Sequence, residues 1–158
     1  MLPSLFIGLV GFFICSYLAL FVLPADATQQ EIYRILFVHV PAAIFSELIY
    51  IFMACCGFIY LVWKTKISAI MLRSAISLGL VFTLIVLISG AIWGKPTWGT
   101  YWVWDARITS TFILLIQYIG LLALRTSFNT MQTTDQILSI VAIVGAINIP
   151  IIKFSVNW

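Results

Sequence analysis

Charged side chains are scarce in this sequence. They account for 8% of the 158 residues, whereas soluble domains carry about 25%. Hydrophobic residues make up 63%, so too few polar groups remain to cover a surface that faces water. This shortage excludes an ordinary soluble domain. It predicts one all-α integral membrane domain whose main solvent is the lipid bilayer.

Clustered charge and cysteine motifs are also missing. The net charge of +3 is spread thinly between apolar runs, without the basic stripe of nucleic-acid-binding proteins, so we expect no nucleic acid partner. Cys15, Cys55 and Cys56 lie inside apolar stretches without CxxC or CxxCH spacing. That pattern gives no sign of a redox dithiol or of a covalently attached cofactor, and we predict small buried hydrophobic side chains.

Long apolar runs are abundant. Those that approach or exceed the length of a bilayer crossing are residues 2–23, 41–63, 74–92, 108–124 and 137–152. They predict a bundle of about five transmembrane helices. The first run has an alternative interpretation as a signal peptide, because residues 25–27 resemble a cleavage site. It lacks a basic start, however, and its apolar core exceeds the usual 7–15 residues, so we expect a retained span.

Segments that follow an odd number of crossings share one membrane face. These segments, residues 24–40, 93–107 and 153–158, contain the only histidine, His39, and most of the tryptophans. Basic residues are divided evenly between the two faces, so their count does not set the orientation. The compact cluster of Lys64, Lys66 and Arg73 favours a cytoplasmic turn, which places the amino terminus inside and the His39 face outside.

The external loop is rich in tryptophan. Five large rings occupy the twelve positions from 93 to 104, namely Trp93, Trp98, Tyr101, Trp102 and Trp104. One interpretation is an interfacial aromatic belt. On a helix, residues 98, 101, 102 and 105 would share an arc of roughly 100°; on an extended segment, residues 98, 102 and 104 would share a side. Either geometry predicts an apolar platform for a large, planar, partly charged ligand.

Polar residues near this face suggest what that ligand is. His39 precedes Pro41 at the expected start of a helix, and neutral imidazole is the usual protein ligand of haem iron. Arg34 and Arg107 lie on the same side and suit the two haem propionates. The alternatives are an interfacial hydrogen bond for His39 and interaction with lipid headgroups for the arginines. Asp105 could hold Arg107 or orient a histidine.

Three polar positions within the spans carry further expectations. Glu47 is an intramembrane acid and therefore a functional candidate whose role is open. We expect Gln117 to form a hydrogen bond between helices. Asn148 and Pro150 predict a local break in the last helix.

Three separated segments, residues 39–43, 93–107 and 148–158, resemble the CcmC family. CcmC is the haem-handling membrane subunit of System I cytochrome c maturation, and the middle segment is similar to its WWD signature. The resemblance implies that haem b is held non-covalently at the outer face of the bacterial inner membrane, or of the mitochondrial inner membrane. It also implies transfer to a haem chaperone, together with ABC transporter subunits, and no enzymatic role.

The resemblance also assigns residues. His39 matches the axial ligand of the haem iron, while Trp98, Trp102, Trp104 and Asp105 match the signature, with Tyr101 where tryptophan is common. Family members continue into a second external histidine and a sixth span, before which this sequence ends. The alternatives are a haem lyase subunit, which would be much larger, and a structural or transport subunit whose aromatic residues form only a belt.

Overall fold

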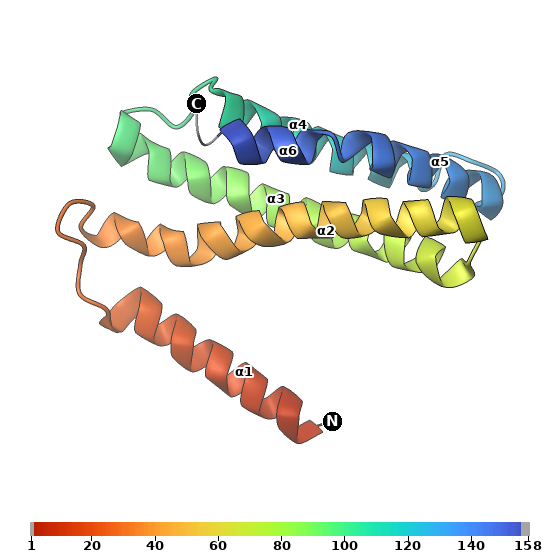
Figure 1. The fold of residues 1–158 in the computed structure, drawn as a ribbon. Helices are drawn as coiled ribbons and strands as arrows, with labels where there is room; N and C mark the ends of the chain where they lie inside the picture. Colours follow the sequence, from red (N-terminus) through yellow and green to blue (C-terminus); the bar gives the residue numbers. More distant parts are fainter. Residues whose placement is uncertain (1, 156–158) are drawn as a thin grey trace.

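Every regular element in the part of the chain that the structure describes is a helix. This computed structural model describes residues 2–155, with side chains from residue 6 onward, so the end of the 148–158 segment lies outside it. The elements are α1 (Leu2–Tyr17), the π-helical turn η1 (Leu18–Val22), the 3-10 turn η2 (Glu31–Ile35), α2 (Leu36–Trp63), α3 (Lys66–Trp98), α4 (Ala106–Leu124), α5 (Met131–Gly145) and α6 (Asn148–Phe154) (Figure 1). The predicted all-α class is confirmed.

Helices α2 and α3 form an antiparallel hairpin (Figure 1). Lys64 and Thr65 connect them, and Lys64 adopts the left-handed conformation with φ of 55°. Helix α3 has 33 residues. At about 1.5 Å per residue it is about 50 Å long, whereas the hydrocarbon core of a bilayer is about 30 Å thick. The ends of α3, including Trp98, therefore extend beyond the hydrocarbon.

The two long helices exceed the apolar runs from which they were predicted. Those runs covered residues 41–63 and 74–92, yet the helices cover 36–63 and 66–98 and include Pro41 and Pro96. Pro41 lies beyond the first turn of α2, whereas the sequence had placed it at the start of a helix, and Pro96 lies in the last turn of α3. Each removes one backbone hydrogen bond, yet the helix continues past it. The hydropathy of a sequence predicts only the part of a helix that lies in the hydrocarbon of the bilayer. The backbone hydrogen bonds of the helix can extend beyond that part, into the polar headgroup region.

The second half of the chain packs against this hairpin through α4, α5 and α6. The last helix is interrupted between Gly145 and Asn148, as Asn148 and Pro150 predicted. The Asn148 side-chain amide donates to the Ser110 carbonyl at 2.9 Å and so ties α6 to α4. The Gln117 amide donates to the Gly145 carbonyl at 3.3 Å, which is the expected hydrogen bond between helices.

The core is centred on two buried tyrosines. The rings of Tyr50 and Tyr118 meet edge to face at 5.2 Å, and the Tyr118 hydroxyl donates to the Ser46 carbonyl at 2.8 Å. Gly79 makes room for this ring, because a Cβ there would lie 2.2 Å from Tyr118. Small residues at helix crossings are a common means of close packing in membranes.

Four segments are long and apolar enough to cross a membrane: Glu31–Trp63, Lys66–Trp98, Ala106–Leu124 and Met131–Phe154. The described apolar stretch of the first predicted span, Phe6–Val22, is shorter, and α1 diverges from the other helices (Figure 1). The number of crossings therefore stays a prediction. Cys15 and Cys55 are exposed, so the predicted burial of the cysteines is right only for Cys56. Exposure of small apolar side chains is acceptable where the neighbour is lipid.

Candidate functional site

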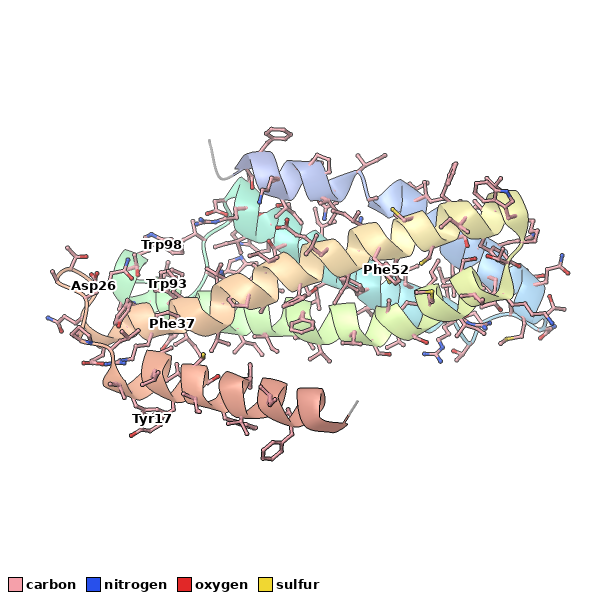
Figure 2. All side chains as sticks on the ribbon, turned by 60° about the horizontal axis from the view of Figure 1, so that its bottom comes forward. Tyr17, Asp26, Phe37, Phe52, Trp93 and Trp98 are labelled. Atoms are coloured by element: carbon pink, nitrogen blue, oxygen red, sulfur yellow. The ribbon has the colours of Figure 1, made fainter. Side chains whose placement is uncertain are left out.

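A cavity of about 430 Å³ opens at the end of the bundle where the α2 helix starts and α3 ends. Figure 2 shows Trp93 and Trp98 at this end, together with Asp26 and Phe37, whereas Phe52 lies farther along the bundle. We call it the His39 cavity. Its walls include most of the predicted site residues, namely His39, Trp98, Tyr101, Trp102 and Arg107.

His39 is held against one face of α3. Its Nδ1 atom lies 2.9 Å from the Ser89 hydroxyl, and its ring meets the Trp93 ring edge to face at 5.7 Å. A Cβ at Gly90 would lie 3.1 Å from the imidazole Cε1 atom, so the absence of a side chain there makes room for the ring. The half-buried histidine therefore has a defined orientation at the cavity wall.

The tryptophan loop is neither a continuous helix nor a continuous extended segment. Helix α3 includes Trp98, and Gly99 ends it in the left-handed region with φ of 77°. Residues 102–105 then have no regular structure until α4 begins. Both geometries considered from the sequence were therefore incomplete, because a single glycine changes the chain direction between Trp98 and Trp102.

Trp102 is the central ring of this loop. It meets Trp104 edge to face at 5.3 Å and Phe112 of α4 at 5.7 Å. Its indole Nε1 atom is buried and has no hydrogen-bond partner among the described residues. A buried N–H group without an acceptor is costly. Since Trp102 lines the His39 cavity, an acceptor supplied by a ligand or by water would remove that cost.

Arg107 brings positive charge to the same cavity. Its guanidinium lies 5.7 Å from the centre of the Trp98 ring, within the range of a cation–π interaction. It is 3.9 Å from the Asp105 carboxylate. Asp105 itself caps α4 by accepting from the Ile108 backbone N–H at 2.6 Å, so it positions the start of the helix that carries Arg107.

Three predicted site residues do not line the cavity. Trp104 is 73% exposed, as an interfacial residue would be, and reaches the site only through Trp102. Asp105 acts as a helix cap. Arg34 pairs with Glu31 and donates to the carbonyls of Ala19 and Leu23 at 3.2 and 2.8 Å, so it fastens the loop between η1 and η2.

That loop contributes Gln29 to the wall of the cavity. The Asp26 carboxylate accepts hydrogen bonds from the backbone N–H groups of Thr28 and Gln29 at 2.9 and 2.8 Å. The bond from Gln29, followed by those from Thr28, lowers the pKa of Asp26. The Gln29 side chain accepts from the Trp93 indole at 3.1 Å. The loop thereby holds the tryptophan that packs on His39.

Several cavity residues were missed or left open by the sequence. Glu47 lines the inner part, with Lys153 of α6 also in the wall. Gln29 and Gly90 of the wall were missed, and so was Ser89, which does not line the cavity but contacts His39. Ser89 could have been found from spacing, because it lies four residues before Trp93 and so shares its helix face. Gln29 had no such signal, because its position depends on how the loop folds back.

A second cavity of about 350 Å³ involves the opposite ends of α2 and α3. Its walls include the predicted cytoplasmic cluster of Lys64, Lys66 and Arg73. Arg73 forms an ion pair with Asp135 of α5 at 2.9 Å. Lys64 lies 5.2 Å from the centre of the Tyr60 ring. The basic cluster and the His39 cavity are thus at different ends of the bundle.

Comparisons with known proteins identify close relatives. A family model described as CcmC, heme exporter protein C, matches residues 1–158. Heme exporter protein C of Escherichia coli (strain K12) is 46% identical over 135 residues, which is 85% of this chain and 55% of that protein. Heme exporter protein C of Haemophilus influenzae is 42% identical, with the same coverage of 85% and 55%.

A mitochondrial relative is equally similar. A putative cytochrome c biosynthesis ccmC-like mitochondrial protein of Marchantia polymorpha is 47% identical over 142 residues, or 90% of this chain and 60% of that protein. The chain therefore spans little more than half the length of the curated relatives that it matches.

Proposed function

The chain belongs to the heme exporter protein C (CcmC) family, and we propose that it binds haem in the His39 cavity and passes it on for cytochrome c maturation. The observation that carries this proposal is the convergence of an imidazole, several aromatic rings and a guanidinium on one cavity at an exposed end of the bundle. The relatives' names add the cargo and the pathway: heme export and cytochrome c biosynthesis.

The polar groups of the cavity fit the edge of a haem. Haem carries two propionate carboxylates, which need cationic or hydrogen-bond donor groups. Arg107 supplies a guanidinium and Trp102 supplies a buried N–H group that lacks an acceptor among residues 2–155. Both residues line the cavity, and a charged donor together with a neutral donor suits a carboxylate. In this proposal they anchor the propionate side of the ligand at the wet boundary.

The apolar part of the cavity fits the face of a haem. Trp98 and Trp102 offer flat indole surfaces, and Trp98 is itself fixed by the Arg107 guanidinium. Burial of a large aromatic surface supplies most of the binding free energy in such a site. The tryptophan loop would therefore bind the flat face of the porphyrin ring. The polar groups would determine how the porphyrin is oriented in the cavity.

His39 is the proposed axial ligand of the haem iron. Within the part of the chain that the structure describes, no group of three or more His, Cys, Asp and Glu side chains could hold a bare metal ion. A lone imidazole suits an iron whose other positions a porphyrin already fills. When bound, haem brings the iron that such a ligand coordinates; the protein binds, orients and shields it without making a covalent bond.

The proposal extends to place and partners. Four described helices long and apolar enough to cross a membrane indicate a multi-pass membrane protein. We place the His39 cavity on the external face of the bacterial inner membrane, or of its mitochondrial counterpart. A haem chaperone would receive the haem there, and ABC transporter subunits of the same system would complete the assembly.

A haem titration tests this function directly. The purified chain, in detergent or nanodiscs, should give a saturable visible spectrum that differs from free haem. Replacing Trp98 and Trp102 together with Ala should weaken binding roughly 10-fold or more, because both flat surfaces are lost. Trp63→Ala is the matched control, since Trp63 lies at the other end of α2 and outside the cavity.

The outcome separates the alternatives. Equal affinity in the double variant and in the control would mean that the aromatic residues form only an interfacial belt. A haem-free chain that never gives a saturable spectrum would reject haem binding by these residues alone.

A further inference from the structure

The imidazole of His39 faces α3 through one particular nitrogen. Its Nδ1 atom lies 2.9 Å from the Ser89 hydroxyl oxygen. We propose that Ser89 is a positioning residue that keeps the proton of His39 on Nδ1 and so leaves the lone pair of Nε2 for a ligand in the cavity. This inference rests on the proposed function, because it concerns the nitrogen that the iron would use.

The hydrogen bonds of Ser89 decide which atom donates. Its hydroxyl donates to the Ile85 carbonyl at 2.5 Å and lies 3.2 Å from the Val86 carbonyl. A serine hydroxyl has one hydrogen and two acceptor lone pairs. With its hydrogen directed to the backbone of α3, Ser89 is left to accept from His39. The shared contact is therefore an Nδ1–H group that donates to the Ser89 oxygen.

The tautomer of the ring follows from this assignment. A neutral imidazole carries one proton, so a proton on Nδ1 leaves Nε2 as an acceptor with a free lone pair. Ligating histidines usually donate their other ring N–H to a second group, which fixes both the tautomer and the ring orientation. Ser89 fills that place for His39.

Two neighbours on the same face of α3 hold the ring against Ser89. Gly90 leaves the space that the Cε1 edge of the imidazole occupies, since a Cβ there would lie at 3.1 Å. Trp93 packs edge to face on the ring at 5.7 Å and is tied to Gln29 at 3.1 Å. In α3, Ser89 thus accepts the hydrogen bond from His39, Gly90 leaves space for its ring, and Trp93 packs against that ring.

The single histidine makes the test direct. Labelling the chain with ¹⁵N-histidine gives one pair of ring nitrogen signals, whose NMR shifts distinguish a protonated from an unprotonated nitrogen. The sample is the haem-free full chain, at a pH where the ring is neutral. We expect Nδ1 protonated and Nε2 unprotonated in the wild type.

Substitutions of Ser89 then test whether its hydroxyl determines the tautomer of His39. Ser89→Ala should shift the population toward the Nε2–H tautomer, because the acceptor for Nδ1–H is gone. Ser89→Thr keeps a hydroxyl and should resemble the wild type. Ser77→Ala is the matched control, because Ser77 is an exposed serine of the same helix outside the cavity.

The affinity for haem gives an independent second measurement. Ser89→Ala should weaken haem binding on the order of 10-fold, the typical effect of removing such an outer hydrogen bond. Ser89→Thr should restore most of the loss.

Each outcome has a separate meaning. A wild-type spectrum with the proton on Nε2 overturns the inference, and this result does not depend on any variant folding. An unchanged tautomer in a folded Ser89→Ala chain also overturns it. If the tautomer behaves as expected but the wild-type chain fails to bind haem, the proposed function fails while the role of Ser89 in setting the tautomer stands.

Discussion

At the scale of single residues, the His39 cavity combines groups that are fixed with groups that are unsatisfied. His39 is held through one ring nitrogen, and Arg107 is held by the Trp98 ring and the Asp105 carboxylate. The Trp102 indole N–H, by contrast, is buried without an acceptor among the described residues. Fixed groups lose little conformational freedom on binding, and an unsatisfied donor gains a hydrogen bond. Both properties favour a ligand.

Replacing His39 with Ala should change the visible spectrum of the haem-loaded chain. The iron would lose its imidazole ligand, so the absorption bands that report the axial ligands should shift. Added free imidazole should enter the vacated space and restore a spectrum close to that of the wild type. An unaltered spectrum in the variant would mean that His39 does not ligate the iron.

Replacing Arg107 with Ala should weaken haem binding on the order of 10-fold, because a charged hydrogen bond to a propionate is lost. Lysine at this position should recover only part of the loss, since it keeps the charge without the planar fork and the stacking on Trp98. Affinities from absorbance titrations measure both effects.

A modified haem without propionate charges is the control for the role of Arg107. Haem dimethyl ester has no propionate charge, so the wild type and Arg107→Ala should bind it about equally. A loss of the same size for haem and its ester would assign Arg107 to packing rather than to the propionates.

At the scale of elements, the end of α3 determines the shape of the cavity wall. Trp98 belongs to the last turn of the helix, and Gly99 then takes φ of 77°, which directs Trp102 back toward α4. Side chains other than glycine pay a steric cost in this conformation. The glycine between the two rings therefore helps both of them to line the same cavity.

Gly99→Ala should lower the free energy of unfolding by about 1 kcal/mol and also weaken haem binding, because the strained turn would relax and move Trp102. Gly120→Ala is the control, since Gly120 lies within α4 and a Cβ there would meet no atom within 4 Å. Chemical denaturation in detergent and haem titration measure the two effects. Equal behaviour of both variants would argue against a role for the turn.

At the scale of the whole molecule, the bundle separates the His39 cavity from the cavity with the basic cluster. The aromatic, histidine-containing cavity lies where α2 starts and α3 ends, and the cavity with the basic cluster lies at the opposite end of that hairpin. Helix α3 is long enough to cross the hydrocarbon with both ends outside it. The two cavities should therefore open on different sides of the membrane.

Cysteine labelling from one side of sealed vesicles checks this arrangement. Single cysteines at Gln29 and Thr100, in a chain whose own three cysteines are replaced, should react with an impermeant reagent added outside. A cysteine at Thr65, beside the basic cluster, should react only after the vesicles are opened. If residues 29 and 100 were labelled from different sides, the loop between η1 and η2 and the tryptophan loop would lie on opposite faces of the membrane, and the proposed site could not form.

The class of the protein follows from the sequence alone. Apolar runs long enough for a bilayer identify helices without any knowledge of packing, because a membrane forces each segment to satisfy its own backbone hydrogen bonds. Counting the predicted crossings then predicted that His39 and the tryptophan loop lie on one face of the membrane. The family resemblance was carried by short contiguous segments, and the comparisons confirm it.

Only the tertiary structure determined which side chains meet. Arg107 lines the cavity, as predicted. Arg34 instead forms hydrogen bonds that hold the loop between η1 and η2, and Asp105 caps the start of α4. The structure also added Ser89, 50 positions from His39 in the chain, and thereby the orientation of the imidazole. Hydropathy depends on each segment's own residues, whereas a cavity wall depends on how separate helices cross and where a glycine turns the chain.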